Sequence, residues 1–546
     1  MKKILLGIGI LLALVLVLAL ILPFIVDLNS YQAQYRPVIE ETLNRKVMLK
    51  DIRLTIIPRI GVRIAGFTVM DDPAFGEQPF ASLSSLDIGV KLGPLLHKRV
   101  EVEEITLRDP IITVIKNPQG VLNTATLGKK GPPKPEAPVA ASTEGPLHIL
   151  TMLAVDQVSI NGGQLRYSDQ SALKPTDYVL EKLQFLVKGV GLGWTPTLHM
   201  ATTIQPYSLP VSMDGRFGPL KETLDFETID LTIMLGKISL AVKGSDLGGD
   251  LKLAITSAAI NTAELPMALP LKKPIEVKNL KIAAEVQGPH TKLENLSLDV
   301  FGGQVVAKGD LTTGAKSPPF DGKVAVQGVQ LGPVMEAVGT DKVSISGTAA
   351  TDLGLRGAGF SMPELTDALQ GSGHLVVKDG KIEGVNLLKE AFALLKAVGI
   401  KQDLANATVF STIESNVAIK HGVIAVERLL MDSHDFQATG TGTVGFDKVL
   451  NLKVNLNLTE AVSQSIAGSS PMAKMAMTGG RISVPMLITG TTQAPSYGLD
   501  TKALGAKAQE QIKEQVKERA GELLKGKIGG GTSEKGQDTL KKLFGQ

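Results

Sequence analysis

The segment Leu450–Leu458 reads LNLKVNLNL and shows a pattern that recurs along the chain. Apolar side chains occupy every second position, and asparagine or lysine occupies the positions between them. Side chains of a strand point alternately to its two faces, so this alternation predicts a strand with one apolar and one solvated face. The same alternation recurs at 86–92, 280–286, 296–300 and 343–345. The sequence therefore predicts a mainly β fold whose strands share an apolar face.

Short glycine-containing segments are expected to form the turns between these strands. Each segment precedes a new alternating run, as in an array of antiparallel hairpins. The four segments are Asn161-Gly162-Gly163, Phe301-Gly302-Gly303, Lys378-Asp379-Gly380 and Lys420-His421-Gly422. The pair Asp379-Gly380 best fits a two-residue type I′ turn. Because the turns follow no fixed period, a propeller or a short-period solenoid is not predicted.

The composition fits a folded protein and excludes several classes of function. Of the 546 residues, 43% are hydrophobic, which is sufficient for a folded chain. The 57 Lys and Arg residues nearly balance the 54 Asp and Glu residues, so the charge indicates no nucleic-acid partner. The sequence has no cysteine, which excludes disulfides, thiolate metal sites and cysteine nucleophiles.

The first 26 residues predict a single transmembrane anchor. Lys2 and Lys3 precede Ile4–Val26, a run of 23 residues without a polar side chain. As a helix, this run is long enough to cross a hydrocarbon core of about 30 Å. A cleaved signal peptide would have a shorter apolar region and a small-x-small cleavage site, and the sequence shows neither. By the positive-inside rule the lysines remain cytoplasmic, which predicts that residues 27–546 lie outside the cytoplasm.

Three further segments interrupt the β pattern. Residues 28–43 have helical periodicity, and Pro37 is expected to kink this helix or end its first half. Residues 128–146 contain five prolines and predict an extended, exposed linker. Asn386 is a suitable N-cap for a helix that should stop at Gly399. Its apolar face would consist of Leu387, Leu388, Ala391, Phe392, Leu395 and Val398.

The sequence contains none of the common catalytic motifs. The chain contains no P-loop, no His-Glu-x-x-His and no Gly-x-Ser-x-Gly motif. Gly440, Gly442 and Gly445 form a GxGxxG motif that leads into the strand 450–458. Dinucleotide binding would require a helix to begin there, so we expect a glycine-rich strand or turn.

A small acidic cluster is a candidate metal site. Asp432, His434 and Asp435 could bind an ion, but they have no partner at helical spacing, and a solvated loop is the preferred interpretation. We therefore predict no catalytic, cofactor-binding or metal-binding residues. The protein is not expected to be an enzyme or to carry a cofactor.

Two arrangements would satisfy the apolar face of the strands. Two sheets could pack face to face as a sandwich, or one long sheet could curl into a trough whose apolar face contacts acyl chains. The periodicity alone does not distinguish these arrangements. For a trough, the candidate lining residues are Leu86, Ile88, Val90, Leu280, Ile282, Leu296, Leu298, Leu452, Val454 and Leu456.

The first 125 residues contain a series of short motifs. These are Asp27-Leu28-Asn29, Arg53-Leu54, Ile57-Pro58-Arg59-Ile60-Gly61-Val62, Phe67-Thr68-Val69, Pro94-Leu95-Leu96, the strand around Ile105, Asp109-Pro110-Ile111 and Gly120-Val121-Leu122-Asn123. In their order and spacing these motifs resemble the AsmA family of Gram-negative envelope proteins. One position departs from the family pattern, because Asn44 precedes Arg45 where glycine is usual. Asparagine tolerates the same left-handed conformation.

A second block resembles the C-terminal half of the family. Its motifs are Gly371-Ser372-Gly373, Lys378-Asp379-Gly380-Lys381-Ile382, Gly384-Val385-Asn386, Gly440-Thr441-Gly442, Val484-Pro485-Met486, Ile488-Thr489-Gly490, Pro495 and Tyr497. The middle of the chain, about 170–320, resembles the family only in its general character.

The residues and the resemblance together predict six regions. They are a transmembrane anchor (1–26), an AsmA-like, chorein-like N-terminal region (27–127), the Pro-rich linker (128–146), a middle β-groove (147–370), an AsmA-like C-terminal β region (371–500), and a charged helix and tail (501–546). The expected fold is mainly β, with an N-terminal transmembrane helix, a long twisted antiparallel β-groove, a few short helices and a C-terminal charged helix.

The resemblance implies a protein anchored in the bacterial inner (plasma) membrane, with a periplasmic body and a role in outer-membrane homeostasis. Relatives are similar in fold to chorein-type bridges, in which an apolar β-groove carries phospholipid between membranes. The expected partners are phospholipid and the inner membrane. The alternative is an assembly factor that regulates the targeting and insertion of outer-membrane proteins through contacts with outer-membrane assembly proteins. The third class, an anchored hydrolase, is disfavoured because no nucleophile motif is found.

Overall fold

The computed structural model describes residues 27–506 except 58, 98, 129–153, 172–175, 222–225, 247–248, 267–268, 340–341, 397–404 and 469–470, together with 509, 513 and 516–518. The fold is mainly β, as predicted. The chain divides into two compact units. Unit 1 contains the residues up to Pro270 together with Pro274–Val300, and unit 2 contains Leu271–Lys273 and the residues from Phe301 onward. This division falls within the region 147–370 that the sequence assigned to one middle β region.

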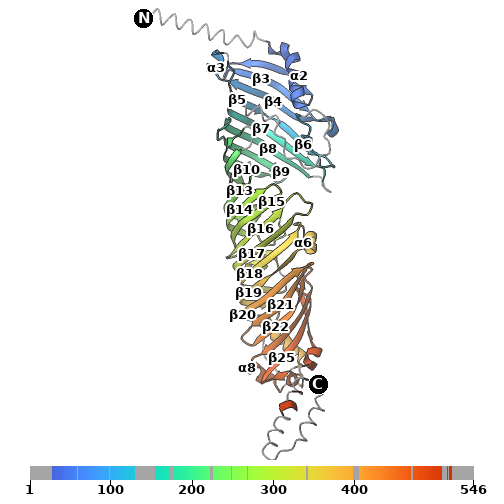
Figure 1. Cartoon of the computed structure of the whole chain (residues 1–546). Coiled ribbons are helices and arrows are strands. Elements are labelled where there is room, and N and C mark those ends of the chain that lie inside the picture. The colour runs from blue at the N-terminus through green and yellow to red at the C-terminus, as the bar shows by residue number, and fades with distance from the viewer. Residues whose placement is uncertain are drawn as a thin grey trace, which may run out of the picture. The chain divides into compact units, whose positions relative to one another are not determined.

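Unit 1 begins with helical residues and continues as a succession of strands (Figure 1). The helical elements are η1 (Leu28–Tyr31), α2 (Gln32–Leu43), η2 (Pro73–Phe75), α3 (Leu92–Leu96) and η3 (Thr262–Glu264). The strands are β1 (Val47–Met48), β2 (Asp51–Thr55), β3 (Gly61–Met70), β4 (Pro79–Val90), β5 (Val102–Arg108), β6 (Ile111–Lys116), β7 (Val155–Asp169), β8 (Thr176–Val190), β9 (Thr197–Gln205), β10 (Leu209–Leu220), β11 (Phe226–Leu235), β12 (Ile238–Ser245), β13 (Leu251–Asn261), β14 (Glu276–Gln287) and β15 (His290–Val300).

The strands of unit 1 belong to one sheet. From β7 to β15 each strand pairs antiparallel with the next. β1 and β2 both pair with β3, which pairs with β4, and β5 and β6 both lie between β4 and β7. β5 and β6 run parallel to β7, which corrects the expectation of a purely antiparallel sheet. Parallel neighbours need a long crossover, and residues 117–154 supply the length.

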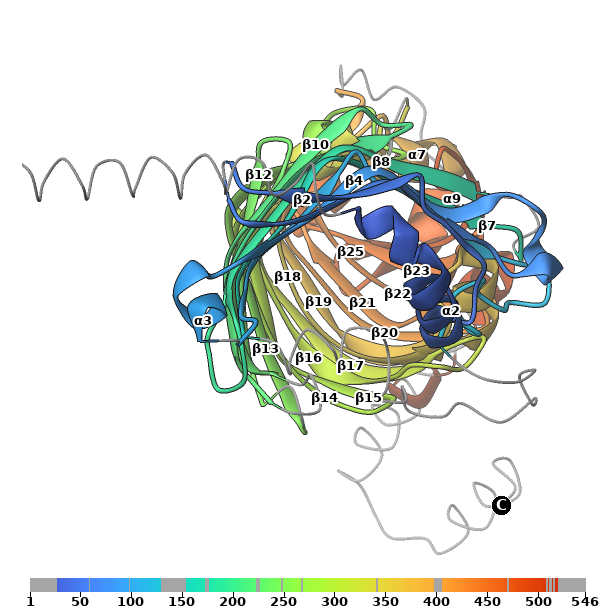
Figure 2. The ribbon, with the colours of Figure 1, turned by 90° about the horizontal axis from the view of Figure 1, so that it is seen from above.

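Unit 2 alternates strands with short helices. Its elements are β16 (Gly303–Thr312), β17 (Pro319–Gln330), α5 (Leu331–Val338), β18 (Ser344–Ala358), α6 (Met362–Ala368), β19 (Gln370–Glu383), α7 (Leu387–Leu394), β20 (Ala407–Lys420), β21 (Val423–Asp432), β22 (Phe436–Gly445), β23 (Leu450–Leu458), α8 (Glu460–Ile466), α9 (Pro471–Met475), β24 (Met477–Thr478), β25 (Arg481–Thr491) and β26 (Ala494–Leu499). β16 to β23, β25 and β26 form successive antiparallel pairs, and these strands curve strongly (Figure 2).

The predicted helices at 28–43 and after Asn386 are both present. α2 continues through Pro37 and ends at Leu43, and the φ of 51° at its C-cap, Asn44, is the left-handed conformation expected there. In α7, Asn386 acts as the N-cap and its side chain accepts a hydrogen bond from the Lys389 amide at 2.9 Å. This helix ends at Leu394, before the predicted stop. The described residues of its predicted apolar face are buried: Leu387, Leu388, Ala391, Phe392 and Leu395.

Two of the four predicted turns are confirmed. Phe301-Gly302 separates β15 from β16, and His421-Gly422 joins β20 to β21. The other two lie inside strands, because β7 continues through 161–163 and β19 continues through 378–380. Gly162 and Asp379 have φ values of 74° and 50° within those strands. Strand irregularities and turns both use positive φ, so these residue types did not distinguish the two.

Three predicted regions lie outside the described residues in whole or in large part. They are the anchor (1–26), the linker (128–146) and the charged helix and tail (501–546). In the part of the chain that the structure describes, no helix combines the length and the apolar character needed to cross a bilayer.

Candidate functional site

The apolar face of unit 1 is built from side chains that lie directly opposite one another on successive strands. We define row 1 as a chain of such partners that takes one residue from each of β2 to β5 and β7 to β15. Its members are Leu54, Val62, Ile88, Ile105, Val158, Val187, Leu198, Gly215, Leu231, Val242, Ile255, Ile282 and Leu296. Every member is apolar, and all are half-buried except Val187, which is buried. Row 1 therefore runs across the unit without a polar side chain.

A second row lies beside row 1 on the same face. Row 2 consists of Ile52, Ile64, Leu86, Leu107, Ile160, Phe185, Met200, Met213, Ile233 and Leu240. Each member is two positions from a row 1 residue on its strand, so its side chain points to the same face. All are half-buried except Ile52, which is buried. This broad apolar surface is neither sealed in a core nor fully exposed.

The opposite face of unit 1 carries charged side chains. Asp87 lies between Leu86 and Ile88 in sequence and forms ion pairs with Arg63 at 2.5 Å and Arg108 at 2.8 Å. Burial favours a higher pKa for Asp87, but the hydrogen bonds from the two arginines outweigh it and lower the pKa. A similar group on this face is Arg216, Asp230 and Lys243. Charged groups on the polar face thus pair with one another, whereas the side chains of rows 1 and 2 are apolar and form no ion pairs.

One face of unit 2 also contains a half-buried row of this kind. We define the open row as Ala307, Val324, Leu353, Gly373, Val417, Val426, Gly442, Leu452 and Ile488, which are successive partners from β16 to β25. All are half-buried except Ile488, which is buried. The open row thus resembles row 1 in both composition and burial.

A neighbouring row of unit 2 differs because the chain itself covers it. The closed row consists of Val329, Ala349, Val377, Ile413, Met431, Ala438, Leu456 and Val484, from β17 to β25. All its members are buried. From Ala349 onward they share one hydrophobic core with Leu388 and Phe392 of α7, Ile466 of α8 and Ala473 of α9. The helices therefore close this part of the apolar face.

The structure separates the ten candidate lining residues into two groups. Eight are half-buried: Leu86, Ile88, Val90, Leu280, Ile282, Leu296, Leu298 and Leu452. Ile88, Ile282 and Leu296 belong to row 1, Leu86 to row 2 and Leu452 to the open row. Val454 and Leu456 are 4% and 0% exposed and belong to the core beneath the helices. At these two positions the chain's own helices occupy the space that the trough hypothesis assigned to acyl chains.

Residues of the N-terminal motifs meet in a buried polar network. Asn123 is completely buried, and its side chain donates to Asp71 at 2.7 Å and to the Thr113 carbonyl at 2.9 Å. Its Oδ1 accepts from the Ile115 amide at 3.0 Å. Arg45 donates to the Asn123 carbonyl at 2.9 Å. The network joins the end of α2 to the segment after β6, so these residues hold the fold together.

A second part of this network was not foreseen from the sequence. Thr126 donates to Asp72 at 2.6 Å, and the Asp72 carboxylate also caps η2 through the Ala74 amide at 3.0 Å. These hydrogen bonds lower the pKa of Asp72 although burial opposes them. No local pattern around Asp71 and Asp72 indicates these contacts, because the partner residues lie more than fifty positions away in the chain.

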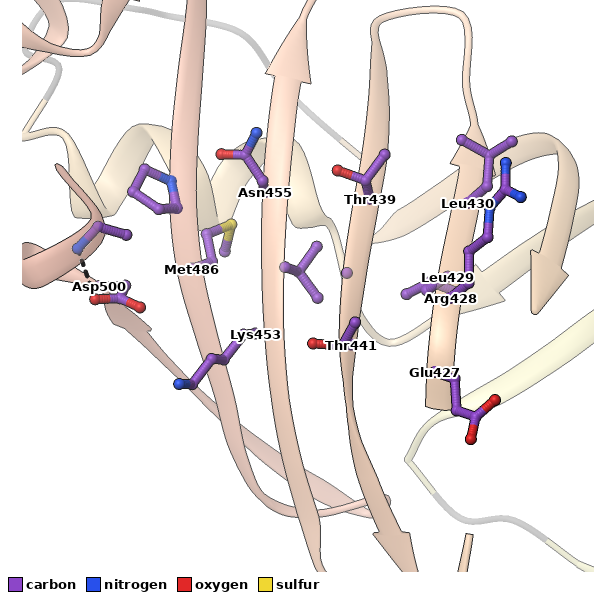
Figure 3. A pocket seen from close by; sticks show the side chains of 14 residues that line it. Glu427, Arg428, Leu429, Leu430, Thr439, Thr441, Lys453, Asn455, Met486 and Asp500 are labelled. Atoms are coloured by element: carbon purple, nitrogen blue, oxygen red, sulfur yellow. Dashed lines mark hydrogen bonds between the residues drawn. The ribbon is translucent and has the colours of Figure 1, made fainter. Parts of the chain in front are cut away.

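A depression of about 610 Å³ lies over β21, β22, β23 and β25 (Figure 3). Thr439 and Asn455 are direct partners on adjacent strands there. The hydrogen bond drawn in the view joins the Ala503 amide to Asp500 Oδ1 at 3.0 Å. These groups are typical of a solvated sheet face, and we assign no chemistry to them.

The GxGxxG motif and the acidic cluster at 432–435 lie in or beside strands of the sheet. Gly440, Gly442 and Gly445 lie on β22 between β21 and β23, as the strand interpretation predicted. A Cβ on Gly442 would lie 2.2 Å from the Asn451 carbonyl oxygen, so glycine permits the close approach of β23. Asp432 ends β21 and accepts from Gln437 at 2.8 Å, and the His434 side chain is 97% exposed. Among the described residues, no group of three or more His, Asp or Glu could hold a metal ion.

Comparison with known proteins identifies one family. The model of the AsmA family matches residues 1–199 and 271–429, which is more than half of the chain. The match includes the N-terminal motifs and the first motifs of the C-terminal block, and the motifs from Gly440 to Tyr497 lie outside it. Neither the curated proteins nor the solved structures gave a significant match.

Proposed function

Because the chain belongs to the AsmA family, we propose that it is a non-enzymatic lipid carrier of the bacterial envelope. Family membership supports a role in outer-membrane homeostasis or lipid transport. The proposed cargo is phospholipid. The proposed location is the inner membrane, because Lys2 and Lys3 precede an apolar run of membrane-spanning length, with units 1 and 2 in the periplasm.

Row 1 is the observation that carries the proposal. Its members succeed one another across unit 1 without a polar interruption, and all except the buried Val187 are half-buried. Neighbouring strands lie about 4.8 Å apart, so one acyl chain would contact several members at once. Each CH₂ removed from water contributes about 0.8 kcal/mol, so a long chain can be held without polar recognition. A uniform apolar row also offers no single site at which a lipid would be trapped.

The two rows of unit 2 differ in whether they could contact acyl chains. The open row offers the same kind of surface as row 1, so we propose that it also contacts lipid. The closed row is filled by α7, α8 and α9 and would take no part. On β23, Val454 is 4% exposed and belongs to the core beneath these helices, whereas Leu452 is half-buried and packs against that core.

A matched pair of substitutions on β13 tests the proposal. Ile255 belongs to row 1, and the next residue, Thr256, is exposed on the opposite face, where Lys281 lies across from it. Ile255→Asp places a charge on the apolar face, and Thr256→Asp adds the same charge to the polar face. The measurement is the phospholipid that co-purifies with the full chain, determined by mass spectrometry, together with thermal melting.

We expect Ile255→Asp to remain folded, because water can reach a half-buried position, and to lose most of its phospholipid. Thr256→Asp should keep the phospholipid of the wild type. A folded Ile255→Asp protein with undiminished phospholipid would show that row 1 does not hold the cargo. Wild-type protein that never carries phospholipid would reject the function itself.

A further inference from the structure

An exposed apolar patch lies at one end of the first strands of unit 1. It consists of Ile57, Leu92, Leu96 and Val100, which are 74%, 53%, 74% and 67% exposed. Ile57 follows β2, Leu92 and Leu96 belong to α3, and Val100 precedes β5. We call these four residues the edge patch. Single exposed apolar residues are common, but several large ones gathered together mark an interaction surface.

The backbone holds the three connections of the edge patch together. The Val90 amide donates to the Ile60 carbonyl and the Lys91 amide donates to the Glu101 carbonyl, both at 2.9 Å. The Arg59 side chain forms an ion pair with Glu103 at 3.4 Å and another with Glu104. These contacts fix the relative positions of the loops after β2, after β4 and before β5. These contacts therefore join the described residues of the three connections that carry the edge patch.

The other end of β2 is tied to the chain that leaves the apolar N-terminal run. That run ends at Val26, and η1 begins at Leu28. Asn29 in η1 donates to Asp51 at 2.8 Å and accepts from the Ile52 amide at 2.8 Å. β2 spans five residues, or about 17 Å. Figures 1 and 2 show α2 and α3 at the same end of unit 1 and on opposite sides of it.

We propose that the edge patch inserts into the headgroup region of the bilayer that holds residues 1–26. Unit 1 would then contact the membrane at two points, with β2 between them. A bilayer is the one occupant that the chain itself keeps within reach of this edge at all times. Apolar side chains gain free energy on entering the interfacial layer, and Arg99, exposed next to Val100, suits lipid phosphates. The inference rests on the proposed membrane location and concerns docking rather than transport.

The natural absence of cysteine permits a direct test on the full chain. Leu96→Cys carries an environment-sensitive dye on the edge patch, and Phe360→Cys, an equally apolar and 63% exposed position in unit 2, is the control. Each labelled protein is placed in nanodiscs of phosphatidylethanolamine and phosphatidylglycerol that contain lipid spin-labelled near the headgroup. We expect the dye at position 96 to be quenched at least threefold more than the dye at position 360. Equal quenching would overturn the proposal.

Two further variants separate docking from transport. Adding Leu92→Ser and Val100→Ser to the Leu96→Cys protein should lower its quenching to the control level, because the patch then loses its apolar side chains. The fold should persist, because both positions are more than half exposed. Unchanged quenching would contradict the edge patch as the docking element. Ile255→Asp in the same background should lose phospholipid cargo and keep full quenching. A wild-type chain that is quenched at position 96 but carries no phospholipid would reject the proposed function and retain the docking proposal.

Discussion

Units 1 and 2 both contain rows of apolar residues that pair across successive strands, but the rows differ in how far the chain buries them. In unit 1, rows 1 and 2 are nearly all half-buried. In unit 2, the closed row has the same apolar composition, but α7, α8 and α9 cover it and form a core with it. Alternation along a strand therefore specifies which face is apolar, and separate segments decide whether that face is closed. An apolar face that the described part of the chain leaves half-buried is available to a ligand of the same chemistry.

The sharpest test of this comparison is a charge on each row of β23. Leu456→Asp places a carboxylate at a completely buried position in the core. An unpaired buried charge costs about 3–5 kcal/mol, so we expect unit 2 to unfold or to melt far below the wild type. Leu452→Asp, four residues earlier on the open row, should cost much less because the position is half-buried.

Circular dichroism melting curves of the two variants provide the measurement. The chain's single tryptophan, Trp194, lies in unit 1 and gives an internal control, because its fluorescence should report unchanged unfolding of that unit. Equal destabilisation by the two substitutions would show that the open and closed rows do not differ in the folded protein.

The second prediction concerns what stabilises unit 1 in place of a large core. Asn123→Ala removes three hydrogen bonds, two of them buried, and leaves one oxygen of the buried Asp71 carboxylate without its Asn123 donor. An unsatisfied buried polar group costs about 1–3 kcal/mol, and a charged one costs more, so we expect a loss of about 3 kcal/mol. Urea unfolding followed by Trp194 fluorescence measures this loss. Val121→Ala, at an exposed position of the same segment, is the control and should leave the curve unchanged.

The sequence predicted local structure well where one short segment contains the whole signal. The alternation at 450–458 became β23, and Asn386 capped α7 as expected. The segment 161–163 was predicted as a turn but lies inside β7, where a shifted register absorbs the glycine conformation. The choice depends on the length of β8 and on its pairing, which a window around Gly162 does not contain.

The sequence predicted the kind of site, an apolar face of the strands, but only some of its residues. Ile88, Ile282 and Leu296 were identified by alternation alone, and their membership in one row required the register of every strand between them. Val454 and Leu456 have the same local pattern as Leu452. Their burial depends on α7, α8 and α9, which lie outside this strand, so no property of the strand itself could reveal it.

The smallest expected effect concerns the polar face of unit 1, which is the face of the sheet opposite rows 1 and 2. Hydrogen bonds from Arg63 and Arg108 lower the pKa of Asp87 in the folded protein below its ordinary value of 3.8. The stabilisation is therefore present above pH 3.8 and is lost as the pH falls through the lower, folded value. The ion pairs are partly solvated, so Asp87→Asn should cost less than about 1 kcal/mol at pH 7, and the gap to wild type should close toward pH 2. Urea unfolding followed by Trp194 fluorescence at both pH values checks this. Asp230→Asn serves as the control, because its two cationic partners lie 3.7 Å away, and should show a smaller effect. A gap that persists unchanged at pH 2 would mean that Asp87 stabilises unit 1 by its shape and not by its charge.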